Sequence, residues 1–450
     1  MTTTTPPPLN ILIVGAGICG PALALLLQRS NPHHNITIIE RCRELRTGGQ
    51  QIDLKANGIP IMKQLGLLDT IRSFCVEESG SRIIDSKGKN LMTFGVTGAD
   101  EKRGTFEFTN EFEFMRGDFV RLMYDTSLSE REILTSNGMT QGSLEYEFNK
   151  TITSLDCSSP TSTTVTFSTG ETKTYDLVLA ADGQGSRTRR LAFGDEVDAA
   201  SFQSLNIHAA YYNVPRLSTE DSLARLYFPS RNRIIMTRTG NQPITQVYFF
   251  LFRDVERAAK MRPVHRQSLA DQKAAWTEVY QDAGWDAPRF LAGLQHVDDF
   301  YSTEIAQVRM PDGKITKNRV VLLGDAGYCP SPMTGMGTTL SLVGLYVLAG
   351  ELASHAGDVD AALKAYTETM KQPVKDGQKL TGLADALNMF PASEWGAWAA
   401  NTFIWTLSSF RVDKMLGWLV GWLPQGNDDT WELPEYPALN VKAPEMQEMR

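Results

Sequence analysis

Three glycines near the start of the chain have the spacing of a phosphate-binding turn. Gly15, Gly17 and Gly20 form the pattern G-x-G-x-x-G directly after the apolar run at 11–14. In this pattern the first glycine permits a tight turn, the second lets the backbone approach a pyrophosphate, and the third lets a helix pack on the strand. The N-terminus of that helix offers N–H groups and a positive dipole end to the phosphates. The pattern therefore predicts a dinucleotide site.

An acidic residue completes the unit around this turn. The apolar run "NITIIE" (35–40) is typical of a second buried strand, and an apolar helix to about Arg29 separates it from the turn. Glu40, which ends the run, can accept hydrogen bonds from both hydroxyls of a ribose. A glycine-rich turn alone could simply be a tight turn. Strand, helix, second strand and acid together indicate a dinucleotide-binding βαβ unit.

Two aspartates further along the chain also follow buried strands. The segment "TYDLVLAAD" ends in Asp182, and "NRVVLLGD" ends in Asp325. Open α/β sheets bind ligands at the carboxyl ends of their strands. The glycine turn and the two aspartates therefore predict one site, assembled at one edge of one sheet from distant parts of the chain.

The composition limits the classes of partner. The chain has 450 residues, of which 42% are hydrophobic, so two or three domains are expected. A net charge of -8 and a pI near 5.4 argue against a nucleic-acid partner, which requires a basic face. The five cysteines are widely spaced and form no CxxC pair. This pattern argues against a disulfide framework and favours a reducing compartment, so we expect a cytoplasmic monomer.

One segment has a membrane-like composition. The stretch 395–424 is rich in tryptophan and leucine, but Arg411, Asp413 and Lys414 divide it. Each apolar piece is shorter than the ~20 residues that a spanning helix needs. We expect no membrane span and a helix packed over the protein body, with attachment to a membrane surface as the alternative. The N-terminal "MTTTTPPP" has no basic region and does not resemble a targeting signal.

Residues 191–300 have a different pattern of apolar and polar residues from the flanking segments. Segments such as "SLNIHAAYYNV" and "ITQVYFFLFRD" alternate or run apolar between turn residues, as antiparallel strands do. We predict that this range forms a sheet inserted between two parts of the nucleotide-binding domain.

These motifs, in this order and spacing, resemble the single-component FAD-dependent aromatic hydroxylases of the para-hydroxybenzoate hydroxylase type, over about residues 9–375. "GGQQIDLKANGIPIMKQLGLLDTIR" (48–72) and "FEFMRGD" (112–118) look closest to the tetracycline-inactivating branch of that family. The resemblance implies an α/β fold: a Rossmann-like FAD-binding domain, an inserted, mainly antiparallel β-sheet substrate domain and a C-terminal helix. The implied ranges are 1–190 and 301–385 for the FAD-binding domain, 191–300 for the substrate domain and 386–450 for the C-terminal helical segment.

The resemblance also implies roles for individual residues. Glu40 would hold the adenosine ribose, Arg116 would reach the phosphate–ribose region, Asp53 would lie by the flavin and Asp325 would bind the ribityl chain. Arg46 matches a position associated with NADPH in that branch. The complete set of predicted cofactor-binding residues is Gly15, Gly17, Gly20, Glu40, Arg41, Arg46, Gly49, Asp53, Arg116, Asp182, Asp325, Pro332, Gly335, Gly337 and Thr338.

The glycine-rich segment "GDAGYCPSPMTGMGTT" (324–339) is interpreted as the flavin loop. Main chain from Pro332 to Gly337 would lie against the isoalloxazine ring, where a side chain at Gly335 or Gly337 would intrude. The next helix would direct its N-terminal dipole at the pyrimidine end of the ring. The chain departs from the family nearby: it has Gly327 and Tyr328 after "GDA", Thr339 at the position of an asparagine and Gly344 at that of an aspartate. A packing role is favoured for Cys329.

The chemistry that the resemblance implies belongs to the cofactor. NADPH, or NADH, would reduce FAD, and O2 would form a flavin C4a-hydroperoxide whose distal oxygen passes to an electron-rich ring. The substrate would be an aromatic or polycyclic small molecule, polyketide-like or tetracycline-like. No catalytic side chain and no metal ligands are expected. The chain has no second G-x-G-x-x-G, which favours transient docking of the nicotinamide nucleotide.

Substrate contacts are expected on the inserted sheet, at His208, Arg225 and Tyr248. His208 matches a polar position that contacts substrate in the tetracycline-inactivating branch. The guanidinium of Arg225 could hold an enol or phenolate oxygen bidentately, and Tyr248 would supply an apolar wall. Alternatively, His208 and Arg225 could pair with neighbouring carboxylates and only hold the sheet together.

Two other functions remain open on the same scaffold. Flavin halogenases share it, but their WxWxIP signature is missing here. Prenyl-protein escort factors also share it and bind partner proteins without flavin, so such a protein would be colourless when purified. The combination of Arg116, Asp182 and Asp325 favours the enzyme.

Overall fold

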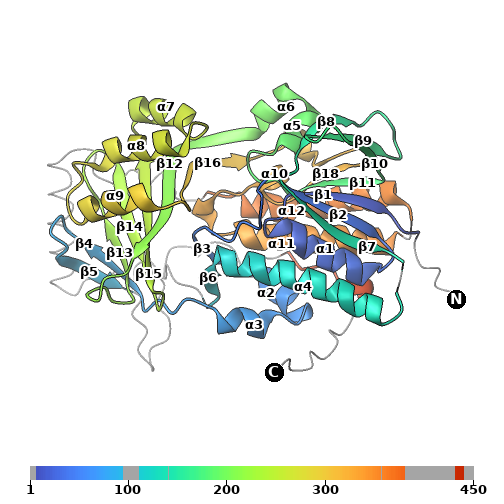
Figure 1. Ribbon diagram of the computed structural model, residues 1–450, viewed down its shortest axis with the longest axis horizontal. Helices are drawn as coiled ribbons and strands as arrows, with labels where there is room; N and C mark the ends of the chain where they lie inside the picture. The colour runs from blue at the N-terminus through green and yellow to red at the C-terminus, as the bar shows by residue number, and fades with distance from the viewer. Residues whose placement is uncertain (1–6, 95–110, 140, 356, 381–430, 440–450) are drawn as a thin grey trace.

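The computed structural model describes residues 7–94, 111–139, 141–355, 357–380 and 431–439. It contains a nucleotide-binding unit and a sheet unit, which lie side by side along the long axis of the molecule (Figure 1). The C-terminal helix predicted within 386–450, including the apolar stretch 395–424, lies largely outside the described residues.

The nucleotide-binding unit is built on a six-stranded sheet of order β17-β18-β11-β1-β2-β7. Every neighbouring pair is parallel except β17–β18, which is antiparallel. The strands are β1 (Asn10–Val14), β2 (Asn35–Glu40), β7 (Ser143–Phe148), β11 (Leu177–Ala180), β17 (Thr316–Lys317) and β18 (Val320–Leu322). The strands that precede the glycine turn, Asp182 and Asp325 are thus neighbours, as the sequence predicted.

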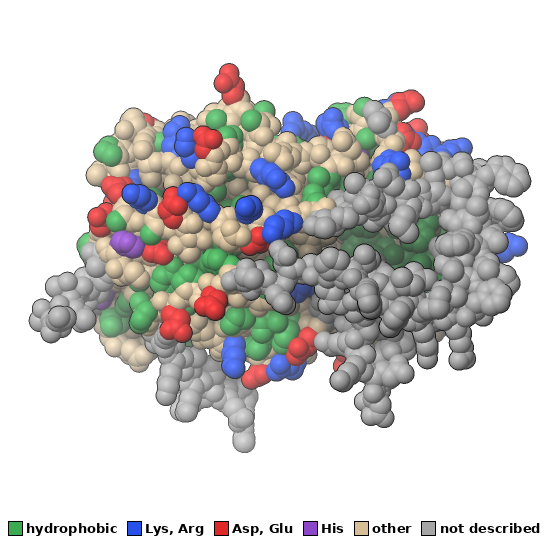
Figure 2. Space-filling view, turned by 180° about the vertical axis from the view of Figure 1, so that it is seen from behind, with side chains coloured by type: hydrophobic (Ala, Val, Ile, Leu, Met, Phe, Trp, Pro, Cys, Tyr) green, Lys and Arg blue, Asp and Glu red, His purple; other side chains and the backbone are tan. Residues whose placement is uncertain are grey.

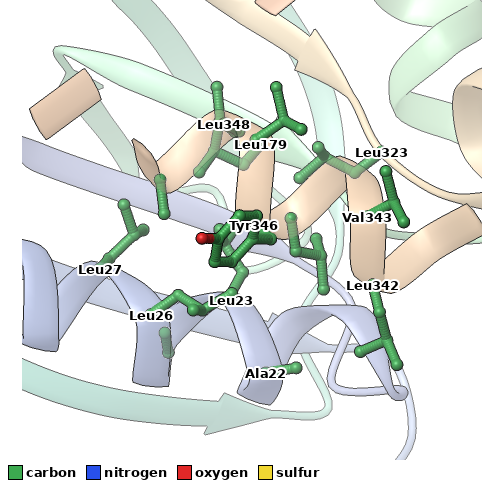
Figure 3. Close-up of a cluster of buried hydrophobic side chains, with 14 of the residues drawn as sticks. Ala22, Leu23, Leu26, Leu27, Leu179, Leu323, Leu342, Val343, Tyr346 and Leu348 are labelled. Atoms are coloured by element: carbon green, nitrogen blue, oxygen red, sulfur yellow. The ribbon is translucent and has the colours of Figure 1, made fainter. Parts of the chain in front are cut away.

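Apolar layers cover both faces of this sheet, because strand residues point alternately to its two sides. Ile11 and Ile13 face a helical layer, whereas Leu12 and Val14 pack toward a three-stranded sheet. Figure 3 shows leucines of α1 and α11 packed around Tyr346 in the helical layer. The helices here are α1 (Cys19–Ser30), α2 (Gly58–Gln64), α3 (Leu68–Ser73), α4 (Arg116–Ser136), α10 (Asp325–Tyr328), α11 (Gly337–Ser354) and α12 (Val359–Gly377). The opposite layer contains β8 (Ile152–Asp156), β9 (Thr163–Phe167), β10 (Thr172–Tyr175), α5 (Arg187–Phe193) and α6 (Asp195–Ser201).

Helix α11 is the core helix of this unit. Among the described residues it is the one helix long and apolar enough to cross a membrane, and 78% of that window is buried inside the protein. The described C-terminal segment, which includes η3 (Pro437–Leu439), packs against it. The Tyr436 hydroxyl donates a hydrogen bond to Glu351 Oε1 at 2.7 Å. The apolar character of α11 therefore comes from burial on all sides.

The second unit is a seven-stranded sheet of order β16-β12-β15-β14-β13-β4-β5, antiparallel except for the pair β13–β4. Its strands are β4 (Ser81–Ile84), β5 (Asn90–Phe94), β12 (Phe202–Pro215), β13 (Ala224–Tyr227), β14 (Arg233–Arg238), β15 (Ile244–Phe252) and β16 (Tyr301–Val308). One face is covered by α7 (Val255–Val264), α8 (Leu269–Tyr280) and α9 (Ala287–His296). The α/β fold class with a mainly antiparallel second sheet is confirmed.

The second sheet is wider than the predicted range 191–300. It includes β4 and β5 from early in the chain and β16 after residue 300, while 191–201 falls in helices. Strand β4 joins through parallel pairing with β13, and β16 joins through antiparallel pairing with β12. Local sequence patterns do not reveal which distant strands pair, because that depends on hydrogen bonds formed in the folded state.

A short ribbon links the two units. Strand β3 (Gln51–Asp53) pairs antiparallel with β6 (Glu113–Met115), and Figure 1 shows this ribbon at the junction between the units. The Gln51 N–H donates to Gln246 Oε1 on β15 at 2.9 Å, which ties the ribbon to the second sheet. Seen from behind, the described surface carries interspersed positive and negative side chains (Figure 2).

Candidate active site

The turn after β1 requires glycine at two positions for different reasons. Gly15 has φ +110°, and a Cβ there would lie 2.6 Å from the carbonyl oxygen of Ala181. A Cβ on Gly20 would lie 2.1 Å from the carbonyl oxygen of Gly15. Both contacts are far below van der Waals separation, so any side chain would move the turn off its strand. A Cβ on Gly17 would have Arg116 Nη2 as its nearest neighbour, at 3.6 Å, which leaves room for a ligand.

Glu40 lies at the end of β2, where its carboxylate supports this turn. The Ala16 N–H donates to Glu40 Oε2 and the Cys42 N–H donates to Glu40 Oε1, both at 3.0 Å. A carboxylate oxygen accepts two hydrogen bonds, so each oxygen retains a lone pair for a ribose hydroxyl. The neighbouring predicted residue, Arg41, is exposed.

Arg116 begins α4 and brings a cation to the glycine turn. Its Nη1 donates to the carbonyl oxygens of Gly48 at 3.0 Å and Arg46 at 3.4 Å. Gly49 has φ +126°, and a Cβ there would lie 3.1 Å from Arg116 Cδ. Burial, and then the charge of Arg46, lower the pKa of Arg116 from its usual value. A guanidinium still carries its charge at neutral pH, so this half-buried cation suits a phosphate.

Asp182 is committed to its own helix. The Ser186 hydroxyl donates to Asp182 Oδ1, while the Thr188 N–H and hydroxyl donate to Oδ2 at 3.0 Å and 2.9 Å. The carboxylate thereby supports the start of α5, where the first N–H groups have no partner within the helix. The Asp182 Cα lies close to the turn, because a Cβ on Gly15 would come within 3.3 Å of it. The structure thus places the backbone of Asp182 at the turn and gives its carboxylate a structural role.

Asp325 reaches the same region from β18. It follows Gly324, which has φ +52°, and it is the half-buried first residue of α10. Burial raises its pKa, whereas a hydrogen bond with Cys329 and the charge of Arg116 act in the opposite direction. The Cys19 thiol lies between these charges: burial and then Asp325 raise its pKa to about 12. Asp325, Cys19 and Arg116 are therefore close enough at the strand ends for each charge to affect the others.

The glycine-rich loop lies against the β3 segment. Pro332–Thr334 forms the 3-10 helix η2, and Gly335 follows in the left-handed region with φ +63°. A Cβ on Gly335 would lie 2.9 Å from Lys55 Nζ and 3.5 Å from Asp53 Oδ2. Lys55 Nζ itself forms an ion pair with Asp53 Oδ2 at 2.9 Å. Asp53 therefore lies beside the loop that the sequence predicted as the flavin loop.

The end of the loop is open. A Cβ on Gly337, the first residue of α11, would meet no atom of the described chain within 4 Å. Pro332 is exposed and Thr338 is half-buried. Thr339, which stands where the family has an asparagine, binds the backbone of Lys55. Its hydroxyl donates to the Lys55 carbonyl at 2.9 Å and accepts from the Lys55 N–H at 3.1 Å.

A shallow hollow lies between the second sheet and the Gly49 segment. The side chains that border it are mainly aromatic or amide: Tyr211, Asn213, Gln246, Tyr248, Asp299 and Tyr301, together with Gly49 and Gln50. Tyr212 and Val247 also line it, but their side chains belong to the core under α7–α9.

Aromatic contacts shape the walls of this hollow. The Tyr211 and Tyr248 rings meet edge to face, 5.3 Å apart, and the Arg46 Cζ lies 5.2 Å from the centroid of the Tyr301 ring. Asp299 Oδ2 accepts from the Gly49 N–H at 3.1 Å. Tyr248 therefore lies in a hollow beside Gly49, and its contact with substrate stays a prediction.

His208 and Arg225 do not reach the hollow. Side chains alternate along a strand, and β12 pairs Tyr211 with Tyr248 on the hollow side, which turns His208 toward α7. His208 is fully buried, and its Nδ1 lies 2.8 Å from His265 Nε2. Arg225 forms ion pairs with Asp221 at 3.1 Å and Glu220 at 4.0 Å. The structure therefore gives both residues partners within the protein, which favours the structural alternative, and their contact with substrate stays an untested prediction.

Several residues of the hollow were missed by sequence reasoning. Tyr211, Gln246 and Tyr301 line it, and Asp299 reaches it from the connection before β16. The alternation in "HAAYYNV" indicates that Tyr211 and Tyr212 face opposite sides of the sheet. Which side faces the ligand depends on the packing of α7–α9, and no local pattern reveals it.

The βαβ turn, the half-buried cation Arg116, the strand-end aspartate and the glycine-rich loop define a class of dinucleotide-binding flavoprotein. The chain belongs to the FAD binding domain family, whose model matches residues 9–377. It is 36% identical over 440 residues to the FAD-dependent monooxygenase asL6 of Sarocladium schorii, covering 96% of this chain and 99% of that protein. The family and this relative identify the chain as an FAD-dependent monooxygenase of the aromatic-hydroxylase type.

Solved structures support the same assignment. The crystal structure of tetracycline destructase Tet(51) matches with a TM-score of 0.72 and 25% identity, covering 96% of this chain and all of that one (100%). Tetracycline destructase Tet(55) matches with a TM-score of 0.71 and 27% identity over the same shares, 96% and 100%. The resemblance to the tetracycline-inactivating branch is therefore confirmed.

Proposed function

We propose that this monooxygenase uses NADPH, or NADH, and O2 to insert one oxygen atom into an aromatic or polycyclic small molecule through a flavin C4a-hydroperoxide. The observation that carries the proposal is the aromatic hollow. Gly49 lines this hollow and also lies against the side chain of Arg116. Tyrosine walls suit a flat ring system, and the amides of Gln246 and Asn213 offer hydrogen bonds to its substituents. The names of the relatives support the same substrate class: two similar structures are tetracycline destructases.

FAD supplies the redox and oxygen chemistry when it is bound, and the chain's own residues bind and orient it. We assign the pyrophosphate to the turn at Gly15–Gly20 together with Arg116. Glu40 takes the adenosine ribose, and Asp325 takes the ribityl chain. The open space at Gly17 and the convergence of Arg116 and Asp325 around Cys19 support this placement.

The cofactor assignment is tested with Asp325→Ala. A charge-assisted hydrogen bond contributes about 1.5–3 kcal/mol, so the variant should lose FAD affinity by about tenfold or more. Asp312→Ala is the matched control, because that carboxylate is 77% exposed and lies in a separate turn. Flavin content after dialysis measures the effect. Equal flavin content in wild type and Asp325→Ala would remove Asp325 from the site.

Arg46 is assigned to docking of the nicotinamide nucleotide. Its guanidinium lies over the Tyr301 ring at the edge of the hollow, where a phosphate could approach it. Arg46→Ala should raise the apparent KM for NADPH by about tenfold while the protein stays yellow. Arg43→Ala is the control, because Arg43 is exposed on the same segment. Unchanged reduction kinetics in Arg46→Ala would contradict the assignment.

The reaction itself is tested with a panel of phenolic and polyketide compounds. NADPH oxidation that depends on the compound, together with transfer of one atom from isotopically labelled O2 into the product, is the expected result. A halogenated product in the presence of halide would favour the halogenase alternative. A colourless purified protein that cannot be reconstituted with FAD would favour the escort-type alternative.

A further inference from the structure

Buried polar side chains join the two units beneath the substrate hollow. They come from the β3–β6 ribbon, the segment before β4 and strands β14 and β15. The members are Gln51, Asp53, Glu78, Glu113, Arg238, Gln246 and Tyr248. Each of these side chains is buried or half-buried.

A continuous hydrogen-bond chain leads from the hollow to Glu113. The Tyr248 hydroxyl donates to Gln246 Oε1 at 2.9 Å, and Gln246 Nε2 donates to Gln51 Oε1 at 3.1 Å. Gln51 Nε2 then donates to Glu113 Oε2 at 3.0 Å. Arg238 Nη2 donates to the same oxygen at 2.7 Å. Because every amide in the chain has its partner, the orientation of Glu113 fixes the orientation of Tyr248.

The charges in this network do not balance. Glu78 and Glu113 both contact Arg238, and their side chains are only 1% and 2% exposed. Asp53 adds a third carboxylate, and Lys55 adds a second cation. Cys75 lies near Glu113 with a thiol whose pKa is raised, mainly by burial. Three carboxylates therefore face two cations in a largely buried region, where an uncompensated charge is costly.

The geometry shows where a proton would relieve this excess. Asp53 and Glu113 are directly opposite each other in the β3–β6 register, which places their carboxyl groups on the same face of the ribbon. Among the described residues, Glu113 Oε1 has no N–H or hydroxyl donor. Two ionised carboxylates are both acceptors, so a hydrogen bond between them requires one proton.

We propose that Glu113 and Asp53 share one proton in the resting enzyme, and that protonated Glu113 is a positioning residue for the substrate wall at Gln246 and Tyr248. The shared proton follows from the pair and from the excess negative charge around it. The role toward substrate rests on the proposed function of the hollow. Asp53 also lies beside the glycine-rich loop, so the pair connects the cofactor side of the site with the substrate side.

The proton should leave the pair at mildly alkaline pH. Burial raises the pKa of Glu113 to about 8, opposed by Arg238 and reinforced by Asp53. A carboxyl group with a folded-state pKa above its unfolded value stabilises the fold below the unfolded pKa, and this contribution is lost as pH rises through the folded pKa. The Tm of wild type should therefore fall relative to that of Glu113→Gln between about pH 5 and pH 9, because the amide cannot ionise.

Infrared spectroscopy of the purified protein tests the shared proton directly. A protonated-carboxyl band should be present at pH 7, decrease as the pH approaches 9, and be lost in Glu113→Gln. Glu78→Gln is the sharper control, because it keeps both members of the pair but removes the excess negative charge. The band at pH 7 should be lost there too, since Arg238 can then neutralise Glu113. A wild-type spectrum without the band, or an undiminished band in either variant, overturns the shared proton.

The positioning role is tested by kinetics with a phenolic substrate that the enzyme turns over. Glu113→Leu, which removes both hydrogen bonds to Oε2, should raise KM by about tenfold with a smaller effect on kcat and with flavin retained. In wild type the KM should rise above about pH 8, and Glu113→Gln should abolish that rise. Equal KM values and pH profiles in all three proteins overturn the positioning role. If no compound is turned over, the proposed function fails, while the infrared and Tm measurements still decide the shared proton.

Discussion

The two faces of the seven-stranded sheet differ in how their polar groups are used. On the face covered by α7–α9, Phe249, Trp276 and Tyr280 form a closed aromatic layer. Polar residues on this face pair with their neighbours, as His208 does with His265. On the opposite face, tyrosines and amides border a hollow next to the nucleotide-binding unit.

This difference shows that residue type alone is a poor guide to function on a sheet. His208 and Arg225 have the chemistry of ligand contacts, but the covered face gives them structural partners. Tyr248 and Gln246 are less distinctive in sequence, and the open face brings them to the hollow. Changes on the covered face should therefore affect stability, and changes on the open face should affect substrate kinetics.

The largest effect is expected from Phe249→Ala on the covered face. Phe249 is fully buried and stacks on Tyr280 with ring centroids 4.0 Å apart. Removing a buried phenylalanine costs about 3–5 kcal/mol through lost burial and a residual cavity. Denaturant unfolding should measure this loss. A cost below about 1 kcal/mol would mean that the covered face is not a packed core.

The second largest effect is expected from acid, which should destabilise the covered face. Burial lowers the pKa of His265 to about 4 and also lowers the pKa of His208. Because the folded-state pKa values lie below the unfolded value of about 6.5, the unfolded state binds more protons as pH falls below 6.5. Wild type should lose on the order of 2 kcal/mol between pH 6.5 and pH 4 through this pair. His265→Gln should show a shallower loss in unfolding measured over the same range, and identical slopes would contradict the assignment.

Tyr248→Phe should separate the open face from the covered one. The change removes the hydroxyl that donates to Gln246 Oε1 but keeps the ring. Stability should fall by only about 0.5–1.5 kcal/mol, the contribution of one neutral hydrogen bond. Substrate KM should rise severalfold, because Gln246 loses a group that orients it. Tyr212→Phe is the matched control, since its hydroxyl donates to the Phe290 carbonyl on the covered side. An equal rise of KM in both variants would contradict the prediction that only the open face affects substrate binding.

The smallest effect is expected from Arg225→Ala. Its partner Asp221 is 42% exposed, and Glu220 keeps a second cation in Arg289 at 2.6 Å. Partly exposed ion pairs contribute about 0–1 kcal/mol. The Tm should change little, and coupled product formation should stay at the wild-type rate. Loss of product with normal flavin content would return Arg225 to the substrate site.

The nucleotide-binding half of this protein could be predicted from local residue patterns. Gly15, Gly20 and Glu40 act through local geometry: a tight turn, a close helix–strand contact and a carboxylate at a strand end. Such requirements leave a pattern of residue types at fixed spacing. These patterns predicted the α/β class and a dinucleotide site, and the resemblance of the motifs to a known family implied FAD and the tetracycline-inactivating branch.

The substrate side depends instead on pairing between distant segments. The membership of β4 and β16 in the second sheet, and the face to which His208 and Tyr248 point, follow from strand pairs that form only in the folded chain. The same is true of the Asp53–Glu113 pair, which forms because β3 and β6 adopt one antiparallel register. Register and the choice of covered face are set by the packing of the whole sheet. A shift of a strand's register by one residue would turn every side chain of that strand to the opposite face of the sheet without changing the local sequence pattern.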